Sequence, residues 1–75
     1  MQVHLLLRKV DLGDNVEAVF HNLDDAYDAR ERANTLYREH MISDLLKLSH
    51  YTRESAERYV NGCSDVFYVD TFEVY

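Results

Sequence analysis

The sequence predicts a small α+β domain in which helices pack on one face of a three-stranded antiparallel sheet. Apolar residues alternate with period two near both ends of the chain, and they recur at three- and four-residue steps in the middle. A length of 75 residues allows one domain, residues 1–75, with a marginal core. The expected order is β-β-α-α-β, with one long helix and one or two short ones.

The first two elements are expected to be strands joined in a hairpin. Residues 2–10 alternate as a strand does, and residues 16–20 do the same. Between them Asp11 to Asn15 forms a turn cluster, in which Gly13 accepts a positive φ without a Cβ clash. We expect one face of this hairpin to meet the helices, through Val3, Leu5, Leu7, Val16, Ala18 and Phe20.

A long helix is expected over residues 23–40. Asn22 is a suitable N-cap, and acidic residues follow in the first turn, where a helix favours negative charge. We expect a break near Ile42-Ser43; the alternative is that the helix continues through Leu45 and Leu48. The core residues expected from these patterns are Leu5, Leu7, Phe20, Ala29, Ala33 and Leu36.

A short helix and a last strand complete the predicted domain. Thr52 can cap a helix of about nine residues that Asn61-Gly62 would end. Residues 66–75 are rich in β-branched and aromatic types, which favours a strand. If this strand returns antiparallel beside the first one, the sheet order is 2-1-3 with the first strand in the centre.

The second face of the predicted sheet is more apolar than a solvent-exposed face should be. Scattered surface hydrophobics are one explanation. A surface that a second copy or another protein covers is the other, and we favour it. The expected contact residues on this face are Leu6, Val19, Tyr68 and Phe72.

Negative charge is concentrated in one segment. The formal net charge is −6, and the seven acids and one base of residues 11–31 account for all of it. Such a chain repels nucleic-acid phosphates, so direct nucleic-acid binding is not expected, although the acids could imitate phosphates. We expect an exposed acidic face that contacts a basic protein surface, made of Asp24, Asp25, Asp28 and Glu31. A merely solvated face is the alternative.

No pattern in the sequence predicts a catalytic centre, a metal site or a cofactor. His40 and Asp44 are four residues apart and supply at most two ligands, whereas a structural zinc site uses four. Cys63 is a lone cysteine, and we expect it to be a small buried apolar residue. No apolar run approaches a membrane span or a signal peptide, so we expect a cytoplasmic protein without membrane contact.

The chain resembles the small accessory proteins of tailed bacteriophages. The resemblance rests on the strand Val3-His-Leu-Leu-Leu-Arg, the pair Val19-Phe20, the helix start Asn22-Leu-Asp-Asp-Ala26 and the last strand Phe67-Tyr-Val-Asp-Thr-Phe-Glu-Val74. It covers most of the chain, but residues 41–49 extend beyond the usual short version. It implies a non-enzymatic protein that binds and blocks a bacterial host protein, as anti-CRISPR and other anti-defence proteins do.

Three hypotheses follow. The first is a phage or mobile-element protein that inhibits a bacterial host or defence protein with a basic surface. The second is a small structural or regulatory homodimer that pairs through its sheet and has no defence target. The third, which we favour least, is an enzyme or metal protein that uses His40, Asp44 or Cys63.

Overall fold

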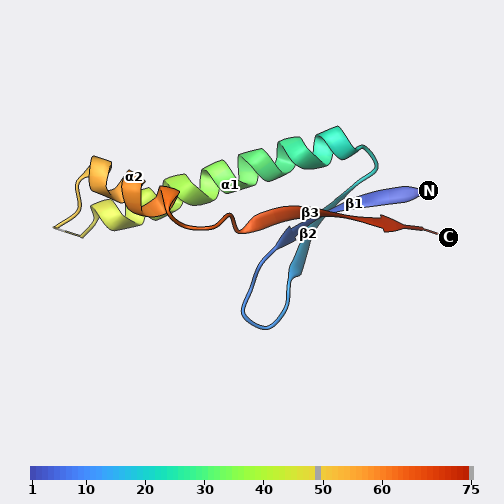
Figure 1. Cartoon of the computed structure of the whole chain (residues 1–75), viewed down its shortest axis with the longest axis horizontal. Coiled ribbons are helices and arrows are strands. Elements are labelled where there is room, and N and C mark those ends of the chain that lie inside the picture. Colours follow the sequence, from blue (N-terminus) through green and yellow to red (C-terminus); the bar gives the residue numbers. More distant parts are fainter. Residues whose placement is uncertain (49, 75) are drawn as a thin grey trace.

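A computed structural model describes residues 1–48 and 50–74 of the chain and confirms the predicted α+β fold. The order of elements is β-β-α-α-β, and the three antiparallel strands lie in the order β2-β1-β3 (Figure 1). The elements are β1 (Gln2–Arg8), β2 (Asn15–Phe20), α1 (Leu23–Leu46), α2 (Arg53–Asn61) and β3 (Phe67–Glu73). The predicted last strand reached to Tyr75, which lies outside the described residues.

The β1–β2 hairpin contains a bulge that changes which face its residues occupy. Leu6 pairs with Ala18, but Leu7 pairs with Val16, so Glu17 is the extra residue. The predicted helix-facing position of Val16 is therefore wrong, because the bulge turns that side chain to the other face. Gly13 has φ 121° in the connecting turn, as its lack of a Cβ permits.

The face of β1 that meets α1 is the opposite of the predicted one. The ring of Tyr37 on α1 lies edge-on to Phe67 of β3, with centroids 6.4 Å apart, so Phe67 marks the α1 side of the sheet. Phe67 pairs with Arg8, and alternation then places Leu6 and His4 on that side as well. Leu6, predicted to face away from the helices, is buried beneath α1.

Two polar side chains are buried on the α1 side, and both are satisfied. His4 Nδ1 and Thr71 Oγ1 form a hydrogen bond of 2.8 Å across β1 and β3. Asn34 of α1 makes two bonds to the backbone of Phe67. An alternating pattern treats a histidine as solvent-facing, but a hydrogen-bonded histidine can be buried at little cost. This is why β1 is turned over relative to the prediction.

Helix α1 runs without a break to Leu46, so the predicted interruption near Ile42-Ser43 is wrong. Ile42 is buried against Ala56 and Val60 of α2, and this packing favours a continuous helix. Leu36, predicted to lie in the core, is 62% exposed. It lies about 200° around the helix from Asn34 and therefore points away from the sheet. The other predicted core residues are buried (Leu7) or half-buried (Leu5, Phe20, Ala29 and Ala33).

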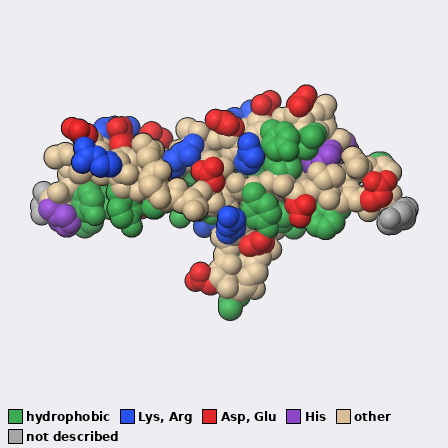
Figure 2. Space-filling model, viewed as in Figure 1, with side chains coloured by type: hydrophobic (Ala, Val, Ile, Leu, Met, Phe, Trp, Pro, Cys, Tyr) green, Lys and Arg blue, Asp and Glu red, His purple; other side chains and the backbone are tan. Residues whose placement is uncertain are grey.

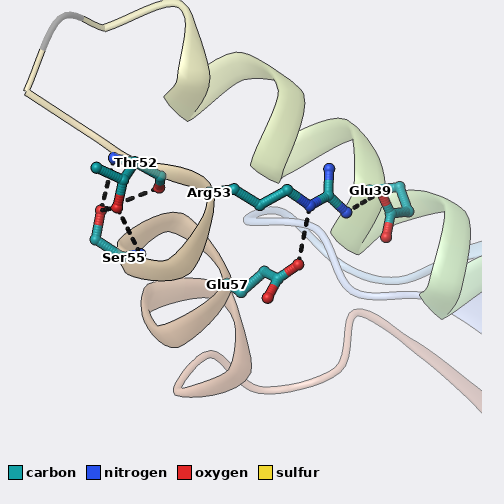
Figure 3. Close-up of polar contacts among 5 residues, drawn as sticks. All are labelled: Glu39, Thr52, Arg53, Ser55 and Glu57. Atoms are coloured by element: carbon teal, nitrogen blue, oxygen red, sulfur yellow. Dashed lines mark hydrogen bonds and ion pairs between the residues drawn. The ribbon is translucent and has the colours of Figure 1, made fainter.

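Local signals and one arginine hold α2 in place (Figure 3). Thr52 is the N-cap, as predicted, and it forms a reciprocal capping box with Ser55. Arg53 donates to Glu57 on its own helix at 3.0 Å and to Glu39 on α1 at 3.3 Å. These two carboxylates raise the pKa of Arg53, first through the hydrogen bond to Glu57. This exposed ion pair links α2 to α1 and adds little to the apolar packing of Ile42 against Ala56 and Val60.

The molecule is elongated. Its principal extents are 53 × 27 × 16 Å, because α1 runs past the sheet and α2 packs only on the far part of α1 (Figure 1). The radius of gyration is 15.2 Å. A compact domain of this length would have about 11 Å. Much of the chain therefore lies at the surface.

Candidate interaction surface

The side of the sheet that α1 does not cover is largely apolar. We call it the outer sheet face and define it by the residues that alternate with those facing α1, namely Val3, Leu5, Leu7, Val16, Val19, Tyr68 and Phe72. Leu7 at its centre is 7% exposed, while Val16, Val19 and Phe72 are about half exposed. Asp70, opposite Leu5, is the acidic residue within this face. All three strands thus contribute apolar side chains to this face, which Asp70 interrupts between Tyr68 and Phe72.

Polar contacts at one end of this face tie the hairpin turn to β3. The Tyr68 hydroxyl donates a hydrogen bond to the carboxylate of Asp14, and the Lys9 ammonium lies 5.8 Å from the centre of the Tyr68 ring. The hydrogen bond to Asp14, followed by desolvation, raises the pKa of Tyr68. The aromatic ring therefore has a fixed orientation on the outer sheet face.

The structure brings together three of the four predicted sheet contacts. Val19, Tyr68 and Phe72 all lie on the outer sheet face, whereas Leu6 is buried on the other side and is not available to a partner. Sequence reasoning missed Leu5 and Leu7, because it placed the two leucines against the helices. The apolar run of β1 gave no means of choosing between its faces.

The predicted acidic residues lie elsewhere, on the first turns of α1. Asp24, Asp25, Asp28 and Glu31 are all exposed, and no ion pair of the described residues involves them. Asn22 caps the helix as predicted, accepting from the Asp24 N–H at 2.8 Å. Since α1 covers the opposite side of the sheet, the acids and the outer sheet face form two separate surfaces. Contact between the acids and a basic partner stays a prediction.

A second apolar region lies where α1 and α2 meet. An open groove of about 350 Å³ is lined by Met41, Leu45, Leu48 and Tyr59, with Asp44 at its side. In Figure 2 hydrophobic side chains gather along the lower side of this end of the molecule, and charged side chains line its upper side. A smaller pocket beside Asn34 holds about 10 Å³, room for one water molecule.

The residues considered for metal or thiol chemistry are separate and exposed. His40 and Asp44 both lie at the surface of α1. Across residues 1–48 and 50–74, no three His, Cys, Asp or Glu side chains converge as metal ligands would. Cys63 is exposed, so the prediction that it is buried is wrong. Its Sγ lies 3.5 Å from the Tyr59 carbonyl oxygen at the end of α2.

The chain exposes more surface than its mass requires. Its accessible surface is 5637 Å². A compact monomer of this mass exposes about 4,800 Å². The difference, about 800 Å², follows from the elongated shape, in which α1 runs past the sheet.

Comparisons with protein-family models, with curated proteins and with solved structures found no match for this chain. The resemblance to bacteriophage accessory proteins therefore rests on the sequence patterns alone. Neither helix in the described part of the chain combines the length and the apolar character that crossing a bilayer requires.

Proposed function

We propose that this chain acts by binding protein rather than by catalysis, and that the outer sheet face is the surface a protein covers. One observation carries the proposal: the uncovered side of the sheet is apolar across all three strands, with Leu7 at its centre. Apolar area of this extent gains free energy when another surface covers it.

Two kinds of partner fit this proposal. One is a host protein that the chain inhibits or modulates, as the resemblance to phage accessory proteins suggests. The other is a second copy of the chain, which would make it a homodimeric subunit. The second has support in the outer sheet face itself, because an apolar surface with one acid is self-complementary over most of its area.

Site-specific photocrosslinking in the cells that produce the chain tests the proposal. A photoreactive phenylalanine analogue replaces Val19 or Phe72 on the outer sheet face, and mass spectrometry identifies what it captures. The matched controls place the same analogue at Leu12 or Leu36, which are more exposed than either test position and lie off this face.

We expect positions 19 and 72 to capture the same protein and positions 12 and 36 to capture none. Capture of the chain itself identifies the homodimer, and capture of one other protein identifies a host target. Equal capture at all four positions, or none at positions 19 and 72, contradicts the proposal.

A further inference from the structure

The backbone of β3 has a free edge on the side away from β1. The Lys9 N–H donates to the Val66 carbonyl at 3.0 Å, and the Val74 N–H donates to the Met1 carbonyl at 2.7 Å. In an antiparallel ladder, directly opposite residues alternate between pairs that exchange backbone hydrogen bonds and pairs that do not. Lys9–Val66 and Met1–Val74 are pairs of the first kind, so the pairs next to them, which contain Phe67 and Glu73, are of the second kind. The N–H and C=O groups of Phe67 and Glu73 therefore point away from β1. By alternation, those of Val69 and Thr71 do too.

Asn34 closes this edge at its first residue. The side-chain amide of Asn34 donates to the Phe67 carbonyl at 3.1 Å and accepts from the Phe67 N–H at 3.0 Å. These are the two bonds that a residue on a neighbouring strand would make. The Thr71 N–H bonds locally to the Asp70 carboxylate at 2.9 Å. From Val69 onward, the side of β3 away from β1 has no strand beside it in the described part of the chain.

The other edge of the sheet is less suited to pairing. The bulge at Glu17 interrupts the backbone pattern of β2, and bulges are a common means of blocking edge pairing. β3 instead keeps a regular register with β1 over seven consecutive pairs. In the view of Figure 1, β3 lies in front of β1. β3 is therefore the edge on which an additional strand can form hydrogen bonds.

The charge of β3 indicates what kind of additional strand would bind at this edge. Asp70 and Glu73 lie on β3, where Glu73 pairs with the N-terminal ammonium at 3.1 Å and Asp70 is the acid left to attract a basic strand; the chain has no Lys or Arg after Arg58. If two copies paired through their β3 strands around Thr71, their Asp70 side chains would lie diagonally, about 7–8 Å apart, and would repel. A Lys or Arg opposite Asp70 would instead form a cross-strand pair, at a position where the side chains approach most closely.

We infer that the edge Val69–Glu73 binds an extended, basic segment of another protein by strand addition. The segment places a Lys or Arg opposite Asp70 and apolar residues beside Tyr68 and Phe72. Asn34 sets the register, because it excludes the added strand from Phe67. This inference goes beyond the proposed function, since it concerns backbone hydrogen bonds at the edge of the sheet, although the side chains of Tyr68, Asp70 and Phe72 beside that edge belong to the outer sheet face.

The experiment uses the full chain, labelled with ¹⁵N, and a capped seven-residue peptide in which Lys alternates with Val and Thr. One control peptide carries N-methyl groups on the amides that would face β3, which keeps its charge and removes its donors. A second control replaces each Lys by Glu. The matched protein variants are Asp70→Lys, which inverts the charge at the edge, and Asp11→Lys, which makes the same change in the hairpin turn.

We expect the Lys peptide to shift the amide signals of Val69, Thr71 and Glu73 most, and to slow their hydrogen exchange. N-methylation or Asp70→Lys should weaken binding about tenfold, and Asp11→Lys less than about twofold. Equal binding of the methylated peptide, or shifts spread over the outer sheet face, overturns the inference. So does absence of binding at millimolar peptide. If the same amide signals shift with protein concentration in the absence of peptide, a second copy of the chain binds the edge, and this result also overturns the inference.

Discussion

The two sides of the sheet differ in a way that composition alone would not suggest. The side beneath α1 buries a histidine and an asparagine, each with hydrogen-bond partners. The outer sheet face has Leu5 and Leu7 on the same strand, yet no helix covers it. A domain of this size normally covers its more apolar side first, because burial of apolar area is its main source of stability.

If the outer sheet face binds a protein as we propose, the fold of the single chain and its interaction surface use different sides of one strand. On the α1 side, small residues such as Ala26 allow the helix to approach the sheet closely, and polar groups determine its position. The outer side keeps large apolar groups available for another molecule. The predictions that follow, in order of decreasing effect, test how far the two sides differ.

Ala26→Glu should produce the largest loss of stability. Ala26 is fully buried and lies three turns before Tyr37, which contacts the sheet, so a carboxylate there would be buried without a partner. We expect the free energy of unfolding to fall by about 4 kcal/mol. Urea denaturation measures it, with Leu36→Glu on the exposed side of α1 as the matched control. If both variants unfold like the parent, the orientation of α1 is wrong.

Leu6→Ala and Leu5→Ala compare the two sides directly at neighbouring positions. Leu6 is 6% exposed beneath α1, and its truncation should cost about 3 kcal/mol. Leu5 is half-buried on the outer sheet face, and its truncation should lower the free energy of unfolding by about 1 kcal/mol while the chain is monomeric. Denaturation at two protein concentrations checks this. If the two variants lose the same free energy of unfolding at the higher concentration but not at the lower one, a second copy covers the outer sheet face.

Asn34→Ala should destabilise the chain by about 2 kcal/mol, because it leaves the N–H and C=O of Phe67 without their partner. Its exposed neighbour provides the control variant, Thr35→Ala, which should change the free energy of unfolding by less than about 0.5 kcal/mol. Thermal or urea unfolding of the two variants measures both changes in the free energy of unfolding. A negligible loss for Asn34→Ala would mean that water replaces the amide at the edge of β3.

Neutralising the acids of α1 should affect association and not folding. The triple variant Asp24→Asn, Asp28→Asn and Glu31→Gln removes like charges on one helix side, so stability should change by at most about 0.5 kcal/mol. If these acids contact a basic partner, association should become slower and less dependent on salt. Stopped-flow mixing with the crosslinked partner measures both. Unchanged rates at low and high salt would assign the acids to solubility.

The smallest effect concerns Tyr68 at high pH. Its hydrogen bond to Asp14 raises its pKa above the ordinary value of 10.0, so the folded state holds the proton more tightly than the unfolded chain. This contribution is complete below pH 10 and is lost as the pH rises through the folded-state pKa. Urea midpoints should therefore fall more steeply above pH 10 for the parent than for Tyr68→Phe. Tyr27→Phe, on α1, should retain the parental slope.

Sequence patterns predicted the features whose signals lie within a few residues. Asn22 and Thr52 cap the two helices as expected, since each side chain bonds to a backbone N–H two or three positions ahead. The strands at both ends and the order β2-β1-β3 also agree with the prediction. Of the candidate interaction surface, Val19, Tyr68 and Phe72 were predicted. Alternation groups Tyr68 with Phe72, but the side of the sheet that they share with Val19 depends on the register with β1 and on the bulge in β2.

Tertiary contacts determine the features that local sequence patterns did not predict, namely the buried side of β1 and the length of α1. β1 has apolar residues on both sides, so the hydrogen bond of His4 to Thr71 and the packing of Leu6 determine which side meets α1. Helix α1 continues through Ile42 because α2, which begins eleven residues further along the chain, packs against it. Caps and turns are satisfied by their own neighbours and are therefore visible in sequence. The choice of a buried side depends on groups far away in the chain, and only the folded structure brings them together.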